Sequence, residues 1–157
     1  MTATAEIAMR FREVFLNGAW VANTNYKKEL TGFDWKIATA KYSSLNTIAL
    51  LAQHINYYVE GVLNVFNGGS LDIKDQFSFD FAPIQSQEEW DNFLNRFFSN
   101  AEEFATHIDK TTDEELRDFF IDERYGTLQR NIDGMMEHSY YHLGQIVLIK
   151  KLLGSRA

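Results

Sequence analysis

Residues 44–69 read SLNTIALLAQHINYYVEGVLNVFNGG. Apolar side chains recur in this stretch at three- and four-residue intervals, which is the spacing of one face of a helix. Ser44 is of a residue type that caps helix N-termini, and Asn67, Gly68 and Gly69 form a strong terminator. The stretch therefore predicts a long helix from about Ser44 to Phe66, and it points to an all-α fold.

The same spacing extends over most of the chain. Ser86 and Glu89 form a capping box, the sequence signature of a helix start, and so do Thr112 and Glu115. With Pro83 as the single proline, few positions interrupt a helix. Long helices are expected at 4–16, from 86 to beyond 108 and at 125–153, with Asn17 and Gly18 ending the first and Gly154 the last, and short helices at 25–30 and 112–120.

A chain of 157 residues with 45% apolar content can bury one core. We therefore expect a single domain, residues 1–157, built as a four-helix bundle. The connection from Gly68 to Gln85 is long for such a bundle, and long loops are often binding loops or lids. Because Phe77, Phe79 and Phe81 alternate in it, we expect an extended segment packed on the helices.

Composition excludes several functions. The net charge of −7 would repel nucleic acid, whose binding depends on Lys and Arg contacts to phosphates. The chain has no cysteine, so neither a disulfide nor a protein thiolate is available. No stretch is apolar enough to span a membrane, and the N-terminal residues lack the pattern of a signal peptide. The expected location is therefore the cytoplasm.

Three histidines are expected to point into the core. His138 and His142 are four residues apart, so they lie on one face of the last helix with Met135, Ile146 and Ile149. His54 lies on a similar face of the second long helix, with Thr47, Leu50, Leu51, Tyr58, Gly61, Val62 and Val65. His107 falls at the edge of its helix's apolar stripe and is excluded from the site.

Two interpretations of these histidines remain open. They are either hydrogen-bonded core residues, the commoner case, or the ligands of one divalent metal ion. A buried polar group without a partner costs about 1–3 kcal/mol, and one ion would satisfy all three rings. Three imidazoles with an open position form a catalytic zinc site, although imidazole also suits nickel, copper and iron.

Metal-bound histidines usually donate their second ring N–H to an acceptor that fixes the ring. Spacing alone does not identify these acceptors. The candidates near the histidines in sequence are Asn131, Glu137, Gln145, Tyr57 and Tyr141.

SLNTIALLAQHINYY (residues 44–58) and EHSYYHLGQIVLIKKL (residues 137–152) resemble the two metal-binding helices of the DinB-like (DinB/YfiT) superfamily. Members are four-helix bundles with one histidine on the second helix and an HxxxH pair, followed by a GQ-type segment, on the last. This chain matches that pattern at His54, His138 and His142, and it continues with Leu143, Gly144 and Gln145. The specific residues are confined to these two helices.

The resemblance implies a metal site formed by His54, His138 and His142, with zinc or nickel as the expected ion. It also implies that the chain forms a homodimer. It also implies a transferase that activates a low-molecular-weight thiol of the bacillithiol type toward an electrophile. A metal ion can lower the pKa of such a thiol, and the lack of cysteine is compatible with a thiol supplied from outside. No catalytic base can be named.

Two other functions remain open. A metal-dependent hydrolase would require a carboxylate, and Asp75 or Asp80 on the long loop could supply one. Alternatively, the chain is a non-catalytic module that binds a metal or small ligand beside Tyr57, Tyr58, Tyr140 and Tyr141. These aromatic residues are otherwise ordinary core residues.

Overall fold

The computed structural model describes residues 2–154, and this part of the chain is helical without a β-strand. Four helices are long: α1 (Ala3–Arg12), which continues as the π-helix η1 (Glu13–Asn17), α4 (Ile48–Phe66), α5 (Gln87–Lys110) and α6 (Leu128–Gly154). Two short helices, α2 (Tyr26–Leu30) and α3 (Trp35–Ala38), lie between η1 and α4. Short 3₁₀ turns occur at η2 (Asp75–Phe77), η3 (Glu115–Arg117) and η4 (Glu123–Tyr125). The prediction of an all-α protein is confirmed.

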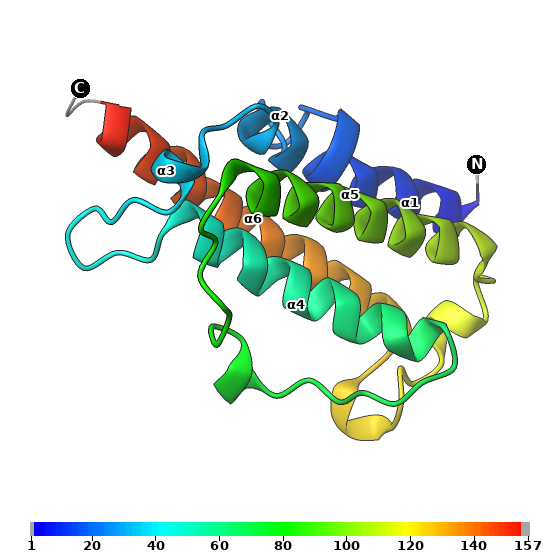
Figure 1. Cartoon of the computed structure of the whole chain (residues 1–157). Coiled ribbons are helices and arrows are strands. Elements are labelled where there is room, and N and C mark those ends of the chain that lie inside the picture. Colours follow the sequence, from blue (N-terminus) through cyan, green and yellow to red (C-terminus); the bar gives the residue numbers. More distant parts are fainter. Residues whose placement is uncertain (1, 155–157) are drawn as a thin grey trace.

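The long helices pack in sequence-distant pairs. Figure 1 shows α1 beside α5 and α4 beside α6, and α5 also contacts α4. The interior between them is rich in aromatic rings, and those of Phe11 on α1 and Phe104 on α5 are stacked with centroids 4.3 Å apart. Burying one such side chain contributes about 1.5–3 kcal/mol, so this aromatic interior is a main source of stability. The largest fully buried side chains are Trp90, Tyr26, Phe11, Phe15, Phe97 and Phe104.

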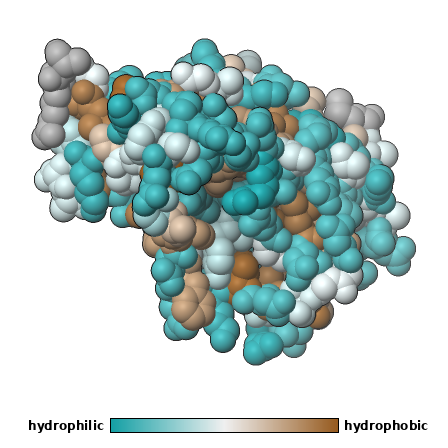
Figure 2. All heavy atoms as spheres, in the orientation of Figure 1, coloured by the Kyte–Doolittle hydropathy of each residue, from teal (hydrophilic) through white to brown (hydrophobic). Residues whose placement is uncertain are grey.

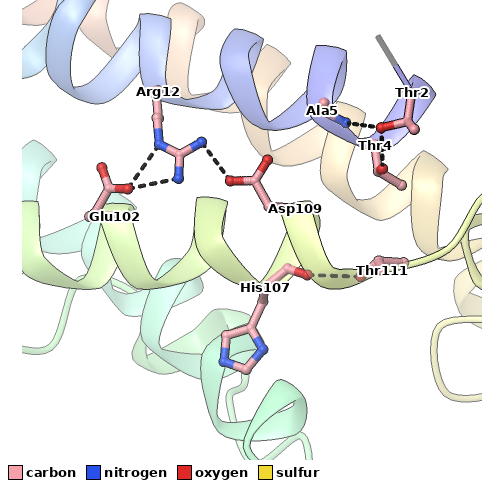
Figure 3. Close-up of polar contacts among 8 residues, drawn as sticks. All are labelled: Thr2, Thr4, Ala5, Arg12, Glu102, His107, Asp109 and Thr111. Atoms are coloured by element: carbon pink, nitrogen blue, oxygen red, sulfur yellow. Dashed lines mark hydrogen bonds and ion pairs between the residues drawn. The ribbon is translucent and has the colours of Figure 1, made fainter.

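A cluster of ion pairs joins α1 to α5 at the surface. The Nε and Nη2 atoms of Arg12 donate to Oε1 of Glu102 at 2.9 and 2.7 Å, and Nη1 lies 2.9 Å from Asp109 Oδ2 (Figure 3). Exposed ion pairs contribute little individually. Here one guanidinium bridges two carboxylates and so links α1 to two turns of α5. Elsewhere on the face seen in Figure 2, the surface is mainly hydrophilic, with smaller apolar patches between polar side chains.

The start of α4 differs from the prediction. Ser44 does not cap the helix; Thr47 does, and its hydroxyl accepts the Leu50 N–H at 3.1 Å. Ser43 has a φ of 53° and is followed by a turn, so the chain reaches helical geometry only at Ile48. The predicted cap is therefore wrong by three residues, because the chain turns at Ser43 before the helix begins.

The chain before α6 also differs from the prediction. Gly126 has a φ of 72°, in the left-handed region that favours glycine, so α6 begins at Leu128 and not at Tyr125. The capping box of Thr112 and Glu115 forms, with reciprocal bonds of 2.7 and 3.1 Å. It starts only the 3₁₀ turn η3, because the chain extends at Asp118 toward a bridge between Phe119 and Thr127.

The remaining helices follow the predicted pattern closely. Asn25 caps α2, and the hydroxyl of Ser86 accepts the Glu89 N–H at 3.1 Å at the start of α5. The carboxylate of Glu89 returns to the N–H of Gln85, so the capping box is shifted by one residue. The first helix ends at Gly18 as expected, although its last turn is a π-helix.

The connection from α4 to α5 runs back alongside α4 (Figure 1). Three side chains of α4 hold it: Tyr57 exchanges hydrogen bonds with the backbone of Lys74, Tyr58 donates to Asp75, and His54 bonds Ser78. The 3₁₀ turn η2 interrupts the alternation of its phenylalanines, and Phe77 and Phe79 are 45% and 41% exposed. The loop therefore covers one side of α4 near His54.

No helix among residues 2–154 is long and apolar enough to cross a membrane.

Candidate metal centre

Helices α4 and α6 bring His54, His138 and His142 together. The Nε2 atom of His138 lies 3.2 Å from Nε2 of His54 and 2.8 Å from Nε2 of His142. His54 and His142 are buried, and His138 is partly exposed. The residues chosen from their spacing thus form one cluster whose ring nitrogens could hold a metal ion.

The opposite ring nitrogens fix two of the three tautomers. Nδ1 of His54 is 2.9 Å from the carbonyl oxygen of Ser78, and Nδ1 of His142 is 2.7 Å from Oε1 of Gln145. Both oxygens are acceptors, so each Nδ1 carries the proton and each Nε2 is left with a lone pair. These two lone pairs face Nε2 of His138.

Hydrogen bonding alone satisfies this cluster poorly. If Nε2 of His138 carries a proton, it can donate well to only one of the two facing nitrogens; if it does not, three lone pairs meet. Three nitrogens bound to one tetrahedral zinc ion at about 2.0–2.1 Å would lie about 3.3 Å apart. The two observed separations, 3.2 and 2.8 Å, are about 0.1 and 0.5 Å shorter than that value, and all ligand atoms lie within 4.8 Å of one another.

The electrostatic environment keeps the three rings neutral, which is the form that binds metal. Burial lowers the pKa of His138 to about 4, with further lowering by His142 and His54. Burial is also the largest cause of the lowered pKa of His54 and of His142. The pKa of each ring therefore lies below that of a free histidine.

Aromatic rings surround the cluster. Phe79 of the loop stacks on His54, with centroids 4.0 Å apart and an interplanar angle of 7°. Tyr58 meets the rings of His54 and His138 edge to face, and Tyr141 meets His142 in the same way. The spacing of the loop phenylalanines indicated contact with the helices but did not indicate which one reaches the histidines.

Of the acceptors considered from sequence, Gln145 is the one that bonds a clustered histidine. The amide of Asn131 donates to the backbone at Tyr125 and Thr127, Glu137 pairs with Arg130, and Tyr57 bonds the backbone of Lys74. The acceptor for His54 is the Ser78 carbonyl, which sequence analysis missed. Every residue carries a carbonyl, so no sequence signal could have identified this one.

The two loop carboxylates have different positions. Asp75 accepts a hydrogen bond of 2.9 Å from the Tyr58 hydroxyl, beside the ring of His138. Asp80 is exposed, whereas the charge of Asp75 acts on the pKa of both His54 and His138. Asp75 is therefore the carboxylate that the fold brings near the cluster.

A cleft of about 600 Å³ opens beside His138. It lies between α4, the loop and the first part of α6, and Tyr58 and Asp75 form part of its wall. Its size is that of a small-molecule site. Of the tyrosines expected to line a pocket, Tyr58 does so, whereas Tyr140 turns toward Glu13 and Tyr141 is 64% exposed.

His107, which was predicted to lie outside the site, bonds Asn67 at the far end of α4, and its ring points away from Arg12 in Figure 3.

Comparisons with profiles of protein families, with curated proteins and with solved structures gave no match to this chain. The geometry of the cluster and its surroundings is therefore the basis for assigning a function.

Proposed function

We propose that the chain is a DinB-like four-helix bundle that binds one divalent metal ion, zinc or nickel, through His54, His138 and His142. The observation that carries the proposal is the convergence of three Nε2 atoms, with two Nδ1 atoms already bonded to acceptors. Acceptors on the second ring nitrogen are typical of metal-bound histidines. A structural histidine cluster would gain little from three nitrogens aimed at one point.

We further propose a transferase that uses a low-molecular-weight thiol. With three protein ligands and an open position, a divalent ion would lower the pKa of a thiol in the cleft. The S–H bond breaks, a new S–C bond forms with an electrophile, and the leaving group departs with the carbon–leaving-group electron pair. This reaction needs no cysteine from the protein, in accordance with the composition.

Asp75 is the proposed acceptor for the thiol proton. Its Oδ1 atom accepts from Tyr58, and Oδ2 has no hydrogen-bond partner among residues 2–154. The same carboxylate could activate a water molecule, which makes metal-dependent hydrolysis the second candidate function. An assay of the metal-loaded protein with bacillithiol and an alkyl halide, beside one with an activated ester, distinguishes the two. Turnover of the ester alone would reject the transferase.

The metal site is tested by elemental analysis of untagged protein. We expect about one ion per chain, and loss of most of it in both His138→Ala and His142→Ala, since each removes one of three ligands. His107→Ala is the matched control because it removes a histidine outside the cluster. A native protein that neither contains nor takes up zinc or nickel would contradict the proposal.

A further inference from the structure

The cleft beside His138 is lined by two cations although the protein is acidic overall. Lys74 from the loop and Arg130 from α6 both border it, and Asp75 is its one carboxylate. The net charge of the chain is −7, so two cations beside one carboxylate in the lining run against the general composition; Glu137, which pairs with Arg130, is not among the lining residues. Such a local excess attracts anionic ligands.

Arg130 lies on the same face of α6 as the histidine. Arg130, Gly134 and His138 follow at four-residue intervals, and Nη1 of Arg130 is the nearest atom, at 3.8 Å, to the position a Cβ would occupy on Gly134. The guanidinium therefore extends along the open surface left by the glycine. At 1.5 Å per residue, the Cα atoms of Arg130 and His138 are about 12 Å apart.

The guanidinium has unused hydrogen-bonding capacity. Nη1 and Nη2 both donate to a single oxygen of Glu137, at 3.0 Å each, and the two side chains are 61% and 65% exposed. An ion pair with this exposure is weak, and a guanidinium has five N–H donors. Lys74 has no ion-pair partner among residues 2–154, while its backbone is held by Tyr57.

We propose that this cleft binds the thiol substrate through a carboxylate held by Arg130, with Lys74 adding charge, while the thiol end reaches the histidine cluster. The apolar side chains of Val62, Ile73 and Met135 also line the cleft and suit an aliphatic connection between the two ends of the ligand. The inference rests on the proposed function for the thiol end only. The expected substrate is a small molecule with a thiol at one end and a carboxylate several bonds away from it.

The carboxylate end is tested first with a ligand that carries no thiol. Hexanoate is titrated into ¹⁵N-labelled protein, with hexanol as the uncharged comparison, and the shifts of Gly134 and of the Arg130 Nε–H are followed. We expect hexanoate to shift these signals and hexanol not to. Arg130→Gln should weaken hexanoate binding about tenfold, since it replaces a charged donor to the carboxylate by a neutral one.

Two further variants make the test specific. Arg96→Gln is the matched control, because Arg96 is 62% exposed and pairs with Glu60 at 3.0 Å on another surface; it should have no effect. Glu137→Gln should strengthen hexanoate binding about twofold to threefold by freeing the guanidinium. Equal effects of the two arginine variants, or equal binding of hexanoate and hexanol, would overturn the proposal.

The link to the cluster is tested by calorimetry with zinc-loaded protein. 6-Mercaptohexanoate should bind about tenfold more tightly than 6-mercaptohexanol, and Arg130→Gln should abolish that difference. Equal binding of the two thiols would count against the inference. If neither thiol binds, the proposed thiol chemistry fails, and the hexanoate titration still decides whether the carboxylate site exists.

Discussion

At the scale of single residues, Gln145 decides how well His142 is oriented. Its Oε1 atom accepts the Nδ1–H of His142 at 2.7 Å. Gln145→Leu removes this acceptor from a half-buried position, so we expect zinc affinity to fall about 10- to 100-fold while the fold is retained. Competition with a chromophoric chelator measures the change.

A control for this variant is available on α4. Gln53 is also half-buried but lines a different cleft, with Pro83 and Asn92. Gln53→Leu should therefore leave zinc affinity within about twofold of the native value, because the ring of His54 keeps its Ser78 acceptor. If both variants lose affinity equally, the role assigned to Gln145 is wrong.

The histidines could be predicted from sequence because helical spacing determines which side chains share a face. His138 and His142 follow from the four-residue interval, and inward apolar neighbours indicated His54. Ser78 and Phe79 could not be predicted, because their contacts depend on the path of a loop that no local periodicity specifies. Tyr58 was recognised as an aromatic residue near the site, but its bond to Asp75 required the same path.

At the scale of helices, the type of each long element followed from apolar spacing, whereas its first residue depended on the preceding turn. Thr47 caps α4 and Ser44 does not, since the chain turns at Ser43, whose φ is positive, and becomes helical only at Ile48. Tyr125 lies outside α6 for a similar reason, since Gly126 adopts a left-handed conformation, which apolar spacing does not reveal. Helix ends are therefore set by tertiary geometry that periodicity does not contain.

The capping assignment at α4 gives a direct test. Thr47→Ala removes the acceptor for the Leu50 N–H and should lower the free energy of unfolding by about 1 kcal/mol. Ser44→Ala should change it by less than about 0.5 kcal/mol, because Ser44 is exposed and outside the helix. Urea denaturation of both variants measures the difference. A larger loss for Ser44→Ala would restore the start of the helix predicted from sequence.

At the scale of the whole molecule, the histidine cluster couples stability to pH. Free histidine titrates near 6.5, whereas the folded protein holds the pKa of His138 at about 4 through burial and the neighbouring rings. The pKa values of His54 and His142 are also lowered. Between about pH 4 and pH 6.5 the unfolded chain binds more protons than the folded one. The free energy of unfolding therefore falls as the pH is lowered through this window.

The metal-free protein should therefore lose stability on mild acidification. Between pH 7 and pH 5 we expect the free energy of unfolding to drop by about 1–2 kcal/mol, a range reduced for solvent screening of the half-buried His138. Guanidinium denaturation of chelator-treated protein at both pH values measures the drop. His138→Phe should reduce it, because the ring that titrates lowest is gone, whereas His107→Ala should not. A native protein that is equally stable at both pH values would show that the folded state accepts these protons as readily as the unfolded chain.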